Sequence, residues 1–83
     1  MLAPLEPLGA EAQLKIALMR AIDSDLKRRF RTLADAAEFA DIDYMRLSRI
    51  RSGRYEYFSI NWLFRLAQTA GVHIRISVDP VNR

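Results

Sequence analysis

The sequence contains no cysteine, which excludes disulfide bonds and metal sites built on thiolates. Its single histidine, His73, has neither paired acids nor other metal ligands near it along the chain. Only three glycines are present, and they form no glycine-rich loop of the kind that cradles phosphates. We therefore expect a binding protein without a cofactor, a metal ion or catalytic residues, and not an enzyme.

Long apolar runs are also missing from the sequence. No stretch reaches the roughly 18 residues that a membrane-spanning helix needs, and residues 1–9 lack the basic segment of a signal peptide. We expect an irregular tail over residues 1–9, one domain over residues 10–78 and a short tail over residues 79–83. These features indicate a cytoplasmic protein, and a domain this small often gains stability from a partner.

Charge is distributed unevenly along the 83 residues. Residues 1–43 carry six basic and eight acidic side chains, a balance of −2, whereas residues 44–83 carry seven arginines and two acids, a balance of +5. Four arginines fall within an acid-free stretch, namely Arg46, Arg49, Arg51 and Arg54. Such a basic surface is typical of nucleic-acid binding, although a solvated helix face is the plainer interpretation.

Residues 10–28 are expected to form the first helix. Leu14, Leu18, Ile22 and Leu26 recur every four residues as an apolar stripe, which no proline or glycine interrupts. A cluster of cations follows, made of Lys27, Arg28, Arg29 and Arg31. These cations either favour the negative end of the helix or contact a DNA phosphate near the start of the next helix.

Residues 32–54 predict two short helices joined by a tight turn, which is the helix-turn-helix unit. Thr32 is a suitable N-cap for the first helix, because its hydroxyl can accept from a free N–H group of the first turn. Ala36 and Ala37 are small enough for a second helix to approach closely. Asp41 then tolerates the left-handed backbone of a helix end better than most residues do.

The second helix of this pair is expected over residues 44–51. Asp43 is a suitable N-cap for it, and Gly53 is a suitable residue to end it. Leu47 and Ile50 lie three residues apart and are expected to face the core. The arginines of this helix are then left to face outward.

This segment resembles the helix-turn-helix of the XRE family of phage-repressor-like regulators, and most closely its branch of HigA-like antitoxins. The matching positions are Thr32, Ala37, Ile42, Leu47, Ser48, Ile50 and Gly53, followed by Phe58, Ser59, Ile60, Leu63, Leu66, Ala67 and Gly71. The resemblance covers residues 14–78. Leu33 departs from it by replacing a glutamine that contacts the DNA backbone, Asp41 by replacing a glycine, and Asp43 by replacing a serine or threonine.

The resemblance implies a lambda-repressor-like bundle of four to five helices that inserts residues 44–51 into the major groove of double-stranded DNA. At the family's positions, Tyr44, Met45 and Arg49 are expected to contact base edges. Arg46 is expected to contact either a base or a phosphate. The remaining candidates are assigned to phosphates, and they are Ser48, Arg51 and Arg54.

Residues 54–58 are too aromatic for a plain linker. Phe58 is expected in the core, next to the start of the following helix. Tyr55 and Tyr57 either donate their hydroxyls to DNA phosphates or cover the edge of the core. Phe30, earlier in the chain, is also expected in the core.

The last helix is expected over residues 60–70, with Ser59 as its N-cap and Gly71 as its end. Trp62 falls outside the apolar stripe of this helix. A large apolar side chain on an outer face indicates either a contact with a second chain or cover for a loop. We assign Trp62 to a dimer contact and keep the second interpretation open.

Residues 72–78 alternate apolar and polar side chains with a period of two, which predicts a strand. No second stretch predicts a strand, and a strand alone leaves its backbone groups unpaired. We therefore expect it to pair with the same strand of a second chain across a two-fold axis. The residues assigned to this dimer interface are Val72, Ile74, Ile76 and Val78.

Together these features predict a mainly α-helical, sequence-specific DNA-binding regulator. A homodimer would present two recognition helices about 34 Å apart to a palindromic site. The family resemblance adds repression of its own operon and a toxin protein as partner. The alternative is a protein-interaction module that uses the same fold without specific DNA binding. A steep fall of affinity with salt, together with a preference for one sequence, distinguishes the first from the second.

Overall fold

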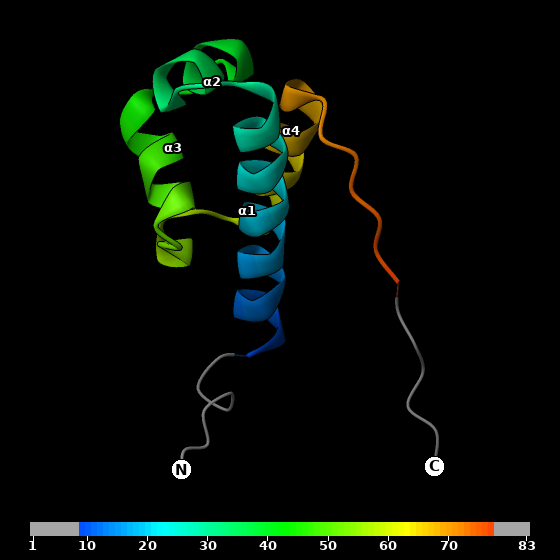
Figure 1. The fold of residues 1–83 in the computed structure, drawn as a ribbon. Coiled ribbons are helices and arrows are strands. Elements are labelled where there is room, and N and C mark those ends of the chain that lie inside the picture. The colour runs from blue at the N-terminus through cyan, green and yellow to red at the C-terminus, as the bar shows by residue number, and fades with distance from the viewer. Residues whose placement is uncertain (1–8, 78–83) are drawn as a thin grey trace, which may run out of the picture.

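The fold is seen in a computed structural model that describes residues 9–77 of the chain. The described residues form a bundle of α1 (Ala10–Arg29), α2 (Leu33–Ala40), α3 (Tyr44–Arg51) and α4 (Ile60–Ala70), with a 3-10 turn, η1 (Tyr55–Tyr57), between α3 and α4. Figure 1 shows α4 beside the long α1, with α2 across one end of the bundle and α3 at its side. The mainly α-helical bundle is confirmed, and the helix bounds agree with the predicted ones within about one residue.

Three helices begin at the side chains that the sequence predicts as N-caps. In each case the side-chain oxygen accepts a hydrogen bond from the backbone N–H three residues further on. The distances are 3.0 Å for Thr32, 2.8 Å for Asp43 and 3.1 Å for Ser59. Each bond satisfies one of the N–H groups that a helix start leaves without a partner.

The turn between α2 and α3 depends on Asp41, whose backbone is left-handed, with φ 58° and ψ 48°. Beyond it, the N–H of Ile42 donates to the carbonyl oxygen of Ala37 at 3.0 Å. This is the Schellman motif, in which a left-handed residue lets the chain turn back onto the last carbonyls of a helix. Asp41 is the only non-glycine residue with positive φ within residues 9–77. The sequence prediction for Asp41 is confirmed.

The core lies between α1, α3 and α4, and the fully buried residues that α2 adds to it are all alanines. Its buried side chains are Leu18, Met19, Ile22, Leu26, Ala36, Ala37, Ala40, Leu47, Ile50, Phe58, Leu63, Leu66, Ala67 and Ala70. Because the fully buried side chains of α2 are methyl groups, this helix can approach its neighbours closely. Met19 is buried although it lies outside the predicted stripe of α1, whereas Leu14 and Phe30 are only partly buried.

The chain after α4 is extended but forms no strand over the described residues 72–77. The predicted strand is therefore not found there, because the described chain offers no neighbouring strand with which these residues can form a ladder. Pairing with a second chain is not tested by a single chain. Val78 and the predicted tails lie outside the described residues, apart from Gly9, which precedes α1.

Candidate nucleic-acid interface

Helix α3 is packed through one face and exposed on the other. Leu47 and Ile50 are buried, as their spacing predicts, with 0% and 2% of their surface exposed. Tyr44 and Met45, in contrast, are 54% and 60% exposed although both carry large apolar groups. In water such groups are normally covered, so this face of α3 has the character of a contact surface.

The outward face of α3 continues into the turn that follows it. Four of its residues, starting from Met45, follow the spacing i, i+3, i+4 and i+7, which places side chains on one side of a helix. The hollow along this side is lined by Met45, Ser48, Arg49, Ser52, Arg54 and Tyr57. We call these six residues the α3 surface. It unites four of the seven predicted DNA contacts, and it adds Ser52, which its spacing from Met45 could have identified.

Arg49 is stacked on an aromatic ring at the centre of the α3 surface. Its guanidinium carbon lies 4.4 Å from the ring centre of Tyr57, well within the range of cation–π attraction. Within residues 9–77 no carboxylate forms an ion pair with Arg49. The two tyrosines of η1 lie in different environments. Tyr55 packs against the core, as expected of a residue that covers its edge, whereas Tyr57 is 57% exposed and its hydroxyl could reach a phosphate.

Arg46 is held from two sides and belongs to a different environment. Its Nε lies 3.7 Å from a carboxylate oxygen of Asp43, and its guanidinium carbon lies 5.7 Å from the ring centre of Trp62. Trp62 in turn stacks on Phe58, with 5.0 Å between the ring centres. These contacts use Trp62 within its own chain and favour the interpretation that it covers a loop.

The two arginines after Arg49 differ in the partners they have. The Nε of Arg51 donates to Oδ1 of Asp23 at 2.9 Å, which joins α3 to α1. Arg54 has no ion-pair partner among the described residues. No sequence signal could have identified Asp23, because 28 residues separate it from Arg51. Of the two, Arg54 has the whole guanidinium group available to an anion.

The basic residues at the end of α1 also differ in whether they have a partner within the chain. Arg29 donates to the carbonyl oxygen of the last residue of α4 and lies 3.0 Å from a carboxylate oxygen of Asp25. Arg28 pairs with the same carboxylate. Lys27 and Arg31 are exposed and have no ion-pair partner within the described range. Arg29 thus contacts the end of α4 and Arg28 is paired with Asp25, whereas Lys27 and Arg31 remain available to an anion.

Leu33, at the beginning of α2, stands where the XRE family that the sequence resembles has a glutamine. Leu33 is partly buried and packs against the core, so it replaces a polar contact by an apolar one. Phe39, which sequence analysis did not single out, is 48% exposed on the same helix. Its ring centre lies 4.9 Å from that of Phe30, and the guanidinium carbon of Arg29 lies 5.1 Å from it.

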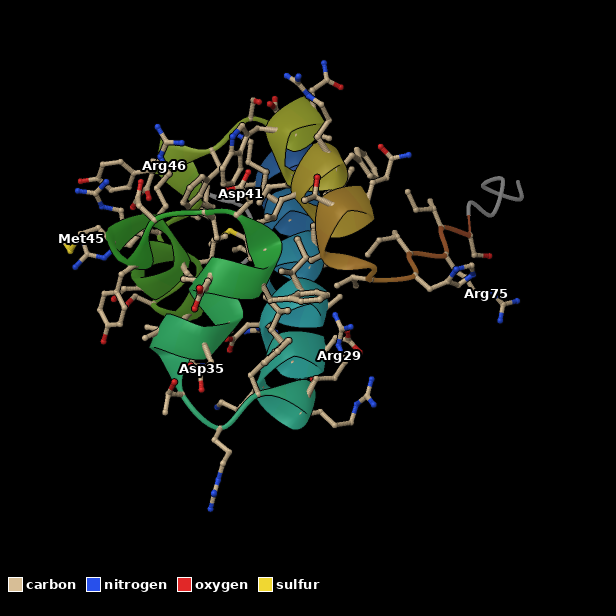
Figure 2. All side chains as sticks on the ribbon, turned by 90° about the horizontal axis from the view of Figure 1, so that it is seen from above. Arg29, Asp35, Asp41, Met45, Arg46 and Arg75 are labelled. Atoms are coloured by element: carbon tan, nitrogen blue, oxygen red, sulfur yellow. The ribbon has the colours of Figure 1, made fainter. Side chains whose placement is uncertain are left out.

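Of the residues assigned to a dimer, those of the described extended segment lie away from the α3 surface, whereas Trp62 lies beside Arg46 of α3. Figure 2 shows Met45 and Arg46 projecting from the opposite side of the molecule to the extended segment that carries Arg75. Within this segment Val72 and Ile74 are partly buried against the core, whereas Ile76 is 55% exposed. A hollow between the segment and α1 is lined by Leu14, Ala17, Leu18, Ala21, His73, Ile74, Arg75 and Ile76.

The described residues hold neither a cluster of metal ligands nor a membrane-spanning helix. Among residues 9–77 no three His, Cys, Asp or Glu side chains gather as ligands for a metal ion. No helix in the same range combines the length and the apolar character needed to cross a membrane.

Comparison with known proteins agrees with the architecture of the bundle. A family model described as a helix-turn-helix domain matches residues 6–79, which include all four helices and the extended segment. No curated protein and no solved structure matches the chain significantly. The family match, together with the exposed face of α3, suggests a DNA-binding regulator. The chain belongs to this family of helix-turn-helix domains.

Proposed function

We propose that this protein is a sequence-specific transcription regulator, a repressor that binds a palindromic DNA site as a homodimer. One observation carries the proposal, namely the outward face of α3. This face combines exposed apolar groups at Tyr44 and Met45 with an arginine that has no carboxylate partner in the described chain. The major groove accepts an α-helix and presents both hydrogen-bonding edges and thymine methyl groups to it.

Within this proposal, α3 reads the bases through three side chains. Arg49 donates two hydrogen bonds to O6 and N7 of a guanine, Met45 contacts a thymine methyl group, and Tyr44 contacts a neighbouring base edge. Replacing Arg49 by alanine would cost about 1–3 kcal/mol and relax the preference at one base pair. An equal loss of affinity on every sequence would contradict this assignment.

Phosphate contacts come from residues at the border of the α3 surface. We assign Ser48 and Arg54 to phosphates, and Arg46 as well, because the ring of Trp62 and the carboxylate of Asp43 already hold its side chain. Arg51 uses Nε for Asp23 and keeps its terminal nitrogens for a phosphate. Such contacts position the protein on the duplex without reading its sequence.

A homodimer forms, in this proposal, through residues 72–78. The extended segment, the absence of backbone hydrogen bonds over the described residues 73–77 and the exposed Ile76 support this arrangement. Replacing Ile76 by glutamate should make the protein monomeric in sedimentation experiments and weaken its binding to a palindromic duplex. The matched control is Ser77→Glu, which adds the same charge on the opposite face of the segment. Equal effects of both changes would contradict the assignment.

The regulated system follows from the resemblance to HigA-like antitoxins. We propose that the protein represses its own operon and binds a toxin encoded beside it. We also propose a cytoplasmic protein that acts by binding alone and has no enzymatic activity. Co-purification with the product of the adjacent gene, expressed from the same operon, would test the toxin partner.

The first experiment is fluorescence anisotropy on DNA from upstream of the protein's own gene, with a scrambled duplex of equal composition as control. Titrations at several salt concentrations would separate the two components of binding. A dimeric regulator should prefer the upstream DNA, bind it with two chains per site and lose affinity steeply with salt. Equal binding to both duplexes would contradict specific recognition of that DNA.

A protein-interaction module is the second candidate, and the apolar hollow between α1 and the extended segment favours it. Ile76 remains more than half exposed at its border. In that case the protein would bind duplex DNA weakly and without preference. Selection from a random duplex pool that enriches no sequence would favour this candidate over the regulator.

A further inference from the structure

We propose that Tyr57 is a positioning residue that orients Arg49 and thereby sets the base preference of the α3 surface. The inference rests on the proposed function, because a base preference exists only if the protein reads DNA through α3. It assigns to Tyr57 a role other than the phosphate contact or the core cover considered from the sequence.

The contact between Arg49 and Tyr57 is the shortest of the arginine–aromatic contacts within residues 9–77. The guanidinium carbon of Arg49 lies 4.4 Å from the ring centre, whereas the corresponding distances in the other three contacts are 5.1 to 5.7 Å. Arg49 is also partly buried, although it lies on the outward side of α3. The ring of Tyr57 therefore confines the guanidinium group while leaving it on the surface.

Tyr57 itself is held by the backbone around it. Its N–H donates to the carbonyl oxygen of Arg54 at 3.2 Å, and the N–H of Phe58 donates to the carbonyl oxygen of Tyr55 at 3.1 Å. Phe58 is buried and Tyr55 packs against the core, so η1 is attached on both sides of Tyr57. The backbone that carries the ring is thus anchored to the core, although Tyr57 itself is 57% exposed.

This geometry suits the recognition of guanine. Bidentate binding requires the flat guanidinium group in one orientation, and a free arginine loses much side-chain entropy in reaching it. Stacking on a ring restricts that orientation before DNA arrives, while the N–H groups at the edge of the guanidinium plane remain free. Arg46 lacks this arrangement, because a carboxylate lies 3.7 Å from its Nε.

The test compares five proteins, namely the wild type, Arg49→Ala, Tyr57→Ala, Tyr57→Leu and Tyr57→Phe. Each selects binding sites from a pool of random 20-base-pair duplexes, and affinities are then measured on the wild-type site and on its single-base variants. We expect Arg49→Ala, Tyr57→Ala and Tyr57→Leu to lose preference for the same guanine. The loss for the tyrosine variants should be about threefold to thirtyfold, the range of exposed to desolvated cation–π contacts. Tyr57→Phe keeps the ring and should keep the preference.

A double-mutant cycle adds a readout that a merely structural role would not change. The effects of Arg49→Ala and Tyr57→Ala on the guanine preference should be strongly non-additive, whereas those of Arg46→Ala and Tyr57→Ala should add. Circular dichroism should show the same helix content in all variants, since Tyr57 contributes little to the core.

Three different outcomes would contradict the role proposed for Tyr57 or the function on which it rests. If the wild type enriches a site and Tyr57→Ala enriches the same site with the same preference, Tyr57 does not position Arg49. If Tyr57→Phe weakens binding to all duplexes equally, the hydroxyl contacts a phosphate instead. If the wild type enriches no sequence, the proposed function itself fails, and this inference fails with it.

Discussion

Arg29 donates a hydrogen bond to the backbone carbonyl oxygen of Ala70 at a distance of 2.5 Å, and so joins the end of α1 to the end of α4. The last carbonyls of a helix have no partner within it, and a cation beside them also favours the negative helix end. The same guanidinium group lies 5.1 Å from the ring centre of Phe39 on α2. One side chain thus connects three of the four helices.

Replacing Arg29 by methionine should lower the free energy of unfolding by about 1–3 kcal/mol, because a hydrogen bond from a charged group to a part-buried carbonyl is lost. Urea denaturation would measure the change. Arg28→Met is the matched control, since the side chain of Arg28 is 71% exposed and pairs only with Asp25. It should change stability by less than about 1 kcal/mol. Equal losses in both variants would show that the carbonyl contact has no special role.

Arg54 and Arg51 should respond differently to alanine substitution. A residue that contacts one phosphate contributes about 0.9 to the slope of log affinity against log salt concentration. We expect Arg54→Ala to flatten this slope by about that amount, with little effect on folding. Arg51→Ala should flatten the slope as well, because its terminal nitrogens are assigned to a phosphate. It should in addition lower the free energy of unfolding by up to about 1 kcal/mol, because its ion pair with Asp23 is lost.

Asp23→Ala is the control for this comparison. It should reproduce the stability loss of Arg51→Ala and leave the salt slope of DNA binding as it is. If Asp23→Ala and Arg51→Ala both left stability unchanged, the pairing seen between α1 and α3 would not matter in solution.

Asp43 should have opposite effects on folding and on DNA binding. It caps α3, but its negative charge lies at the end of the helix that approaches DNA in the proposed function. Asp43→Asn retains a good cap and removes the charge, so DNA affinity should rise by up to about fivefold, which corresponds to about 1 kcal/mol. Asp43→Ala should lower the free energy of unfolding by about 0.5–2 kcal/mol. Thermal unfolding and anisotropy titrations would separate the two effects, and an unchanged affinity of Asp43→Asn would place the carboxylate away from DNA.

Asp41 should tolerate glycine better than any β-branched residue. Its left-handed backbone costs a residue with a Cβ roughly 1–2 kcal/mol, and glycine avoids this cost. We expect Asp41→Gly to raise the free energy of unfolding by up to about 1 kcal/mol and Asp41→Val to lower it by about 1–2 kcal/mol. Glu38→Gly, within α2, should instead lower it by about 0.5–1 kcal/mol. If both glycine variants were destabilised equally, the turn would not depend on the left-handed conformation.

The helix starts and ends of this protein could be predicted because their causes are local. Thr32, Asp43 and Ser59 cap the helices that follow them, and each bond spans only three residues. The inward direction of Leu47 and Ile50 likewise follows from helical spacing alone. The strand predicted over residues 72–78 is different in kind, because a strand needs a partner for its backbone. Among the described residues, Val72 donates only to the end of α4, and residues 73–77 have no backbone partner within their own chain.

The sequence by itself determined four helices, the N-caps of three of them, the left-handed turn at Asp41 and the basic character of α3. These depend on backbone geometry and on contacts a few residues apart. Only the tertiary structure decided which arginine of α3 faces which partner. Asp23 forms an ion pair with Arg51, and the rings of Trp62 and Tyr57 form cation–π contacts with Arg46 and Arg49. These partners come from α1, α4 and η1, and the packing of the core, not the local sequence, brings them to α3.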